Sequence, residues 1–286
     1  MTELTEIYGW GRYPKQDARL LMPSTIASLE SISKQENSFI TRGMGRSYGD
    51  SANALHVLQT NYINHFIEFD KATGKLTTEA GITLREILEV IVPSGWFLPV
   101  TPGTSYVTLG GAIASDVHGK NHHIAGTFGQ HVTSLNLVLG TGEVVTASPQ
   151  HHTDLFHATC GGMGLTGIIV SATIQLLPIR SSFISQKTIK ADCIEAACEA
   201  FESNSDATYS VAWIDCLSKG KSLGRSVIML GEHAEQGGLE FDIRQKVSVP
   251  FSTPSALLNS STMKAFNTAY WYKAKHSVSQ TVSLIP

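Results

Sequence analysis

Cysteine is scarce in this sequence, and its spacing is irregular. The 286 residues include four cysteines, which are Cys160, Cys193, Cys198 and Cys216. No two of them form a C-x-x-C motif, and the intervals between them follow no regular pattern. This pattern is typical of reduced, structural thiols and predicts a reducing compartment.

Long hydrophobic runs and a surplus of basic charge are also missing. No apolar stretch approaches the roughly 18 residues that a membrane-spanning helix needs. Residues 1–17 contain no basic region followed by an apolar run, so we expect no secretory signal. A formal net charge of −3 disfavours nucleic-acid binding. We therefore expect a cytoplasmic protein, with any contact at the inner membrane being peripheral.

Glycine, in contrast, is plentiful, and three loops are rich in it. The most informative is residues 101–123, TPGTSYVTLGGAIASDVHGKNHH. Residues 109–115 are small and apolar, which predicts a short helix under a flat ligand, with its N-terminal amides facing an anion or an electron-rich ring. The polar residues from Asp116 to His123 need a ligand or a hydrogen-bond network. The alternative is a solvated turn, because glycine-rich loops are weak motifs.

The first of the three loops along the chain, ahead of the second at residues 101–123, is residues 41–50, TRGMGRSYGD, which follow a short predicted strand at residues 39–40. Successive backbone N–H groups in such a turn form a concave nest for phosphate oxygens. The loop is not a Rossmann fingerprint, because Tyr48 stands where the third glycine of G-x-G-x-x-G would be. It also lacks the G-K-[ST] of a Walker A loop. A glycine hairpin turn remains the alternative.

The rest of the chain predicts an α+β protein in which hairpins and helices intersperse. The predicted helices are residues 26–34, a capping-box helix that starts at Thr83, 154–159 and 194–201. The predicted strands are 66–69, 76–79, 134–139, 143–146, 168–177, 209–214 and 225–230. The third glycine-rich loop, residues 160–167, precedes the strand at 168–177. The composition changes near Ser181, where we expect a second domain to begin.

The segments RGMGRSYGDSA, PGTSYVTLGGAIASDVHGKNHH and GGMGLTGII closely resemble the FAD-binding oxidoreductases of the vanillyl-alcohol-oxidase type. The run D-V-H-G-K-N-H-H is the most specific part, and the similarity extends from Gly9 to Tyr270. The resemblance implies a two-part FAD-binding domain of this type, also called PCMH-type, at residues 1–180. An antiparallel-sheet substrate domain would follow at residues 181–286.

The same resemblance implies where FAD would bind. The first loop would surround the pyrophosphate, the second would line the ribityl chain and the isoalloxazine, and the third would pack near the flavin. The implied residues are Thr41, Arg42, Gly43, Met44, Gly45, Arg46, Ser47, Tyr48, Gly49, Asp50, Ser51, Gly103, Thr108, Leu109, Gly110, Gly111, Ser115, Asp116, Val117, His118 and Ile169. Family members that attach FAD covalently use a histidine where this chain has Arg46, so we expect non-covalent FAD.

His118 and Lys120 are the candidate catalytic residues. By the resemblance, His118 would face the substrate, and Lys120 could meet a substrate phosphate. Two alternatives for His118 are a hydrogen-bonded structural histidine and a zinc ligand with His122 and His123, although neither a cysteine nor a carboxylate completes that set. We expect no metal. Lys120 could equally be a solvated lysine.

The implied reaction is FAD-dependent oxidation of a sugar hydroxyl. The resemblance points to C2 of a polyprenylphosphoryl-β-D-ribose, a step toward an arabinose donor for the cell wall, with an NAD(P)H-dependent keto-reductase as partner. The alternatives are a sugar-lactone or alditol oxidase and a non-catalytic FAD-binding protein. Relatives continue beyond the segment that ends at Lys273 and supply a lysine and a tyrosine there. We therefore expect a truncated substrate domain, weak FAD binding, aggregation and no turnover by this chain alone.

Overall fold

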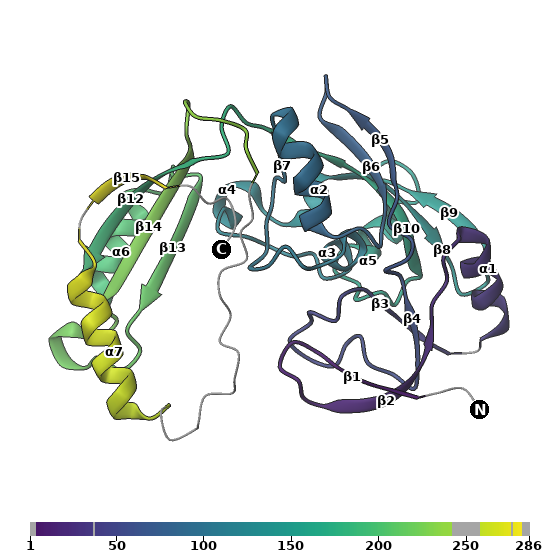
Figure 1. Cartoon of the computed structure of the whole chain (residues 1–286), viewed down its shortest axis with the longest axis horizontal. Helices are drawn as coiled ribbons and strands as arrows, with labels where there is room; N and C mark the ends of the chain where they lie inside the picture. The colour runs from purple at the N-terminus through teal and green to yellow at the C-terminus, as the bar shows by residue number, and fades with distance from the viewer. Residues whose placement is uncertain (1–3, 37, 242–257, 276, 282–286) are drawn as a thin grey trace. The chain divides into compact units, whose positions relative to one another are not determined.

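The computed structural model describes residues 4–36, 38–241, 258–275 and 277–281 (Figure 1). The described residues up to Pro178 form one compact unit, and those from Ile179 onward form another. The second domain predicted at residues 181–286 includes residues 242–257, 276 and 282–286, and these lie outside the described residues.

The first unit begins with a small mixed sheet. Its strands are β1 (Thr5–Tyr8), β2 (Lys15–Leu21), β3 (Ile40–Arg42) and β4 (His56–Gln59), in the order β1-β2-β4-β3. β1 and β2 are antiparallel, whereas β4 runs parallel to both β2 and β3. The predicted strand at residues 39–40 is misplaced, because pairing with β4 starts at Ile40 and continues to Arg42. Helix α1 (Ile26–Gln35) starts at a capping box made by Thr25 and Ser28.

A larger antiparallel sheet forms the centre of this unit. Its strands are β5 (Phe66–Asp70), β6 (Lys75–Glu79), β8 (Val132–Val138), β9 (Val144–Ala147) and β10 (Ile168–Gln175), in the order β5-β6-β10-β8-β9. Both predicted hairpins are present. β10 lies between β6 and β8 and is almost wholly buried, which agrees with its β-branched sequence. It ends before the predicted Leu177, because β11 (Leu177–Pro178) pairs instead with β7 (Trp96–Phe97).

The other helices of the first unit are short. They are α2 (Leu84–Ile91), α3 (Leu109–Ala114), α4 (His122–Ala125) and α5 (Thr153–Thr159), with 3-10 helices η1 (Val92–Ser94) and η2 (Phe128–His131). The predicted capping box of α2 is present, with Thr83 and Glu86 as its two members. Its buried side consists of Leu84, Ile87, Leu88 and Ile91, as the helical spacing indicates.

The second unit is an antiparallel sheet with a helix on each face. Its strands β12 (Ile184–Ala191), β13 (Tyr209–Ile214), β14 (Ser226–His233) and β15 (Ser277–Thr281) follow the order β13-β14-β12-β15. Helix α6 (Ile194–Glu202) packs its Ala197 on Ala191 and Ile228. Helix α7 (Ser260–Lys273) contacts the adjacent Lys190 through Trp271, so it lies on the opposite face. A 3-10 helix, η3 (Gly220–Ser222), precedes β14.

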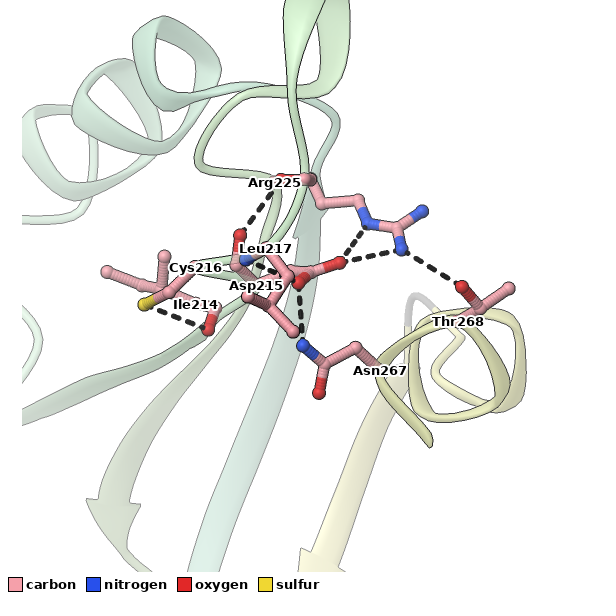
Figure 2. A network of polar contacts seen from close by, with 8 residues as sticks. Ile214, Asp215, Cys216, Leu217, Arg225, Asn267 and Thr268 are labelled. Atoms are coloured by element: carbon pink, nitrogen blue, oxygen red, sulfur yellow. Dashed lines mark hydrogen bonds and ion pairs between the residues drawn. The ribbon is translucent and has the colours of Figure 1, made fainter. Parts of the chain in front are cut away.

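A buried carboxylate holds α7 to the end of the β13–β14 hairpin (Figure 2). Asp215 is 2% exposed and accepts hydrogen bonds from Nε and Nη2 of Arg225 at 2.9 and 2.7 Å. Nδ2 of Asn267, on α7, donates to the other carboxylate oxygen at 2.6 Å. Burial would raise the pKa of Asp215, but the hydrogen bonds from Arg225, Asn267 and the Leu217 backbone outweigh it and hold that pKa below its ordinary value.

No helix within the described ranges is both long and apolar enough to cross a bilayer. α7, the longest of these helices at 14 residues, is held by polar groups as much as by apolar contact. The guanidinium of Arg225 lies 5.4 Å from the centroid of the Trp271 ring on α7, so a charged group packs against an aromatic ring there.

Replacing Asp215 by asparagine should destabilise the second unit. Asp215→Asn leaves the mostly buried Arg225 guanidinium without its counter-charge, which costs about 3 kcal/mol. Because the folded pKa of Asp215 is depressed, the stabilisation is present at neutral pH and is lost as the pH falls below about 4. Urea unfolding followed by tryptophan fluorescence measures both effects. Asp206→Asn, an exposed position, is the control, and equal midpoints for the two variants would contradict the prediction.

Candidate functional site

The three glycine-rich loops meet around one cavity in the first unit. Its volume is about 380 Å³ when the open mouth is included. The lining residues are Thr41, Gly43, Thr60, Thr108, Gly110, Gly111, Ala114, Met163, Gly164, Gly167 and Ile169. Nearly all are glycine or small residues, so the wall consists largely of backbone. A flat, elongated ligand can approach such a wall closely.

The first and second loops touch at Gly43 and Thr108. A Cβ atom on Gly43 would lie 2.3 Å from Oγ1 of Thr108, which is far inside van der Waals contact. That hydroxyl is already fixed, because it accepts a hydrogen bond from the Gly111 N–H at 3.1 Å as the N-cap of α3. Glycine at position 43 is therefore required by packing between the loops.

The third loop is bonded to the end of α3. The Gly161 N–H donates to the Ile113 carbonyl at 3.0 Å, and the Met163 N–H donates to the Ala114 carbonyl at 2.8 Å. Met163 has a positive φ of 53°, an uncommon conformation for a residue with a side chain. These bonds place Met163 and Gly164 on the cavity wall beside Ala114.

The amides at the start of α3 do not face the ligand, contrary to the sequence-based expectation. The Leu109 and Gly110 N–H groups donate to the carbonyls of Ile82 and Ala80, each at 2.8 Å. The Gly111 N–H donates to Thr108. These hydrogen bonds attach α3 to the chain between β6 and α2, so they position the helix and leave no free donor for an anion.

Free backbone donors occur in the first loop instead. In the part of the chain that the structure describes, the N–H groups of residues 44–51 donate no hydrogen bond. Such a run of unsatisfied donors suits phosphate oxygens. Arg42, predicted to contact phosphate, is used otherwise: its guanidinium donates to the Tyr8 and Ala52 carbonyls at 2.7 and 3.1 Å and to Asn53 Oδ1 at 2.8 Å. Arg42 therefore shapes the loop.

The outer side of the first loop is covered by the N-terminal segment. The Trp10 N–H donates to the Ser47 carbonyl at 2.8 Å, and the Arg46 guanidinium lies 5.2 Å from the centroid of the Trp10 ring. This stacking arrangement restrains both exposed side chains.

His118 and Lys120 lie on an exposed turn after α3. The turn follows Asp116, whose Oδ1 accepts a hydrogen bond from the Gly129 N–H at 2.7 Å. The His118 ring lies 5.3 Å from the His122 ring, centroid to centroid. No group of three or more His, Cys, Asp and Glu side chains within the described ranges could hold a metal ion, so the zinc alternative gains no support. Partial burial lowers the pKa of Lys120.

The structure brings together some of the predicted residues and not others. Thr41, Gly43, Thr108, Gly110, Gly111 and Ile169 line the cavity. The predicted residues outside the lining are Arg42, Met44, Gly45, Arg46, Ser47, Tyr48, Gly49, Asp50, Ser51, Gly103, Leu109, Ser115, Asp116, Val117, His118 and Lys120. Leu109 is fully buried, whereas Tyr48 is 88% exposed. Among these, residues 44–51 carry the free amides of the first loop.

Five lining residues were not predicted. Met163, Gly164 and Gly167 belong to the third glycine-rich loop, whose composition could have identified them. Ala114 lies in the small-residue run of α3, which gave a weaker signal. Thr60 has no signal in the sequence, because it reaches the cavity only through the position of β4 beside β3.

The comparisons agree with this geometry. Residues 20–148 match the family described as FAD binding domain. Residues 20–148 of this chain are thus similar to FAD-binding domains. The α+β fold expected for the vanillyl-alcohol-oxidase type is confirmed: alkyldihydroxyacetonephosphate synthase superposes with a TM-score of 0.65 at 15% identity, over 76% of this chain and 47% of that chain.

Two curated relatives are informative. The chain is 36% identical to decaprenylphosphoryl-beta-D-ribose oxidase of Mycolicibacterium smegmatis over 95% of its own length and 63% of the relative. It is 30% identical to a putative D-arabinono-1,4-lactone oxidase of Neurospora crassa over 51% of its length and 26% of the relative. The chain thus spans less than two thirds of the length of either relative.

The residues present fit FAD. The wall of glycine and small residues lets a planar ring approach the backbone closely, and the free amides of residues 44–51 suit the pyrophosphate of FAD. Gly43 lies where these two parts of the site join. We expect Thr108, Gly110 and Gly111 to contact the part of FAD that enters the cavity.

A methyl group at Gly43 should weaken FAD binding. Gly43→Ala forces Cβ against Thr108 Oγ1, and overpacking of this kind costs about 1–3 kcal/mol. The Kd for FAD should rise about 5- to 150-fold, as measured by fluorescence titration. Gly140→Ala is the matched control, because a Cβ there also meets nothing within 4 Å and Gly140 lies in the β8–β9 hairpin, outside the cavity lining. Unchanged FAD affinity in Gly43→Ala would show that the contact does not shape the site.

Cys160, in the third loop, should react slowly with thiol reagents. Burial and the nearby Asp116 carboxylate raise the pKa of Cys160 to about 11 from 9.0, so the reactive thiolate is about 100-fold rarer at pH 8. Cys198 and Cys216 are exposed and serve as internal controls. Timed labelling with a maleimide and peptide mapping gives the three rates. Labelling of Cys160 as fast as Cys198 would contradict the assigned pKa.

Proposed function

We propose that this chain is the FAD-binding part of an oxidoreductase that oxidises C2 of a polyprenylphosphoryl-β-D-ribose to the 2-keto sugar. The observation that carries the proposal is the meeting of the three loops at one cavity, with the His118 turn directly after the helix whose Ala114 lines it. The choice of substrate is supported by 36% identity to the Mycolicibacterium smegmatis oxidase over 95% of this chain.

The chemistry divides between the cofactor and the protein. Bound FAD would supply the oxidant, since a flavin accepts the hydride that leaves the carbinol carbon. His118 would accept the hydroxyl proton, so that the C–H and O–H bonds break as the C=O bond forms. Lys120, with a cationic ammonium on the same turn, would hold the substrate phosphate. Both side chains are exposed and therefore reachable by a large lipid-linked sugar.

The chemistry of the proposed substrate and product indicates which partners this protein would work with. A 2-keto sugar becomes the arabinose epimer when hydride is returned to the opposite face, so an NAD(P)H-dependent keto-reductase would act next. The substrate carries a polyprenyl chain that stays in a bilayer, which supports a cytoplasmic protein working at the membrane surface. Neither partner is needed for the first oxidation, so that step can be tested alone.

The oxidation should depend on His118 while FAD binding does not. The complete gene product containing this chain is loaded with FAD, and flavin bleaching by a polyprenylphosphoryl ribose is followed in a stopped-flow instrument. His118→Ala should keep FAD and lose about 10²–10⁴ in the reduction rate. His65→Ala, at an exposed position immediately before β5, is the control.

Substrate exchange separates the proposal from its main competitor. The similarity to a putative D-arabinono-1,4-lactone oxidase over 51% of the chain favours a sugar lactone as the alternative substrate. Bleaching by that lactone and not by the lipid-linked ribose would replace the proposed substrate. Bleaching by neither would leave an FAD-binding protein without this oxidase activity.

A further inference from the structure

Asn121 is a buried amide at the base of the exposed turn that carries His118 and Lys120. The residue is 3% exposed, and its Nδ2 donates to the Pro99 carbonyl at 2.7 Å. Its own carbonyl accepts hydrogen bonds from the Ile124 and Ala125 N–H groups at 3.0 and 2.7 Å, which start α4. One residue therefore connects the turn, the short helix after it and the segment that follows β7.

Gly119 allows the same turn to lie close to the segment that follows β7. A Cβ on Gly119 would lie 2.6 Å from the Thr101 carbonyl oxygen and 3.2 Å from Asn121 Oδ1. The Gly119 carbonyl accepts the His122 N–H at 3.2 Å, which closes the turn. The backbone between His118 and Lys120 thus lies in direct contact with residues 99–101, although its side chains are exposed.

The other end of the turn is fixed separately. The Val117 carbonyl accepts the Phe128 N–H at 2.9 Å, and the Asp116 carboxylate accepts the Gly129 N–H at 2.7 Å. The turn is therefore held at both ends, and Asn121 provides the buried side-chain hydrogen bond at the second end. Without it, the exposed segment would lose the contact that selects one conformation.

We propose that Asn121 is a positioning residue, which fixes the turn so that His118 and Lys120 are oriented for the oxidation. This inference rests on the proposed function, because it gives His118 and Lys120 their purpose. Misplacement of a catalytic group by about 1 Å lowers rates on the order of 10²-fold. A buried hydrogen bond one residue from Lys120 and three from His118 is well placed to prevent such a displacement.

The amide uses only its donor side. Within the described residues, Asn121 Oδ1 has no hydrogen-bond partner, whereas Nδ2 has Pro99. A protonated carboxylic acid could therefore replace the amide, since its O–H can donate to the same carbonyl. A carboxylate could not, because it has no hydrogen to donate and would be repelled by the Pro99 oxygen. Asn121→Asp thus converts the anchor into one that forms only when it is protonated.

The first measurement does not require turnover. Amide hydrogen exchange of the peptide covering residues 117–124 is followed in the 286-residue chain at pH 8 and pH 5.5. At pH 8, exchange in Asn121→Asp should be at least about 5-fold faster than in the unaltered chain at the same pH. At pH 5.5 most of this difference should disappear, because burial beside the Pro99 carbonyl oxygen should raise the pKa of a carboxyl at this position well above its ordinary value and favour the protonated form. Asn121→Ala should exchange faster at both values.

The second measurement is flavin reduction in the complete gene product. Asn121→Asp should retain FAD, and its flavin should be reduced about 10- to 100-fold more slowly than that of the unaltered protein at pH 8. At pH 5.5 its rate should approach that of the unaltered protein at the same pH. Asn121→Ala should stay slow at both. The other ionisable side chains of the turn, which are His118, Lys120, His122 and His123, are the same in Asn121→Asp and Asn121→Ala, so Asn121→Ala reports their contribution. The segment packed against Asn121, residues 98–102, has no titratable side chain.

Asn64→Asp is the matched control, because it adds the same charge at an exposed position in the first unit. Acid recovery in Asn121→Asp alone, in both measurements, supports the proposal. The proposal would be overturned if Asn121→Asp at pH 8 showed the same exchange and flavin-reduction rates as the unaltered protein. It would also be overturned if Asn121→Ala regained these rates at pH 5.5 as fully as Asn121→Asp does. If exchange changes as expected but reduction does not, Asn121 holds the turn without positioning catalysis, which also overturns the proposal.

Failure of the proposed function would be recognised separately. In that case the unaltered protein would not bleach with the lipid-linked ribose, whatever the exchange data show. The exchange measurement would still decide whether Asn121 anchors the turn.

Discussion

The contact between Gly43 and Thr108 is the constraint on which the cavity depends. The first loop can approach α3 closely only because position 43 lacks a Cβ atom. Thr108 in turn cannot move away, since its hydroxyl caps α3 and the next two N–H groups of that helix are bonded to Ile82 and Ala80. The cavity wall is thus fixed by backbone on one side and by a hydroxyl with a hydrogen-bonding role on the other.

The three loops differ in what their backbone N–H groups bind, and this difference explains their separate roles. The amides at the start of α3 are consumed in attaching the helix, and those of Gly161 and Met163 attach the third loop to it. The backbone N–H groups of the first loop stay free, and the loop is held instead by the Arg42 guanidinium, which donates hydrogen bonds to Tyr8, Ala52 and Asn53. All three loops therefore line the wall, and the first also retains the donors that an anionic ligand needs.

The two units use polar groups for a similar purpose. In the first unit, Asn121 attaches the exposed turn of His118 and Lys120 to buried backbone, and in the second, Asp215 attaches α7 to a hairpin end. In both cases one buried polar side chain connects two elements of the same unit. Buried hydrogen bonds are directional, so they fix the orientation of such elements as well as their attachment.

Local sequence determined much of this protein. Capping signals, hairpin glycines and β-branched runs predicted α1, α2, the β5–β6 and β8–β9 hairpins, and strands β10, β13 and β14, because these signals act over a few residues. The three loops were also recognisable from their glycines. Only the tertiary structure decided which amides stay free, that Arg42 binds carbonyls, and that Thr60 lines the cavity. The reason is physical: each of these depends on partners distant in the sequence, which the fold alone brings within hydrogen-bond distance.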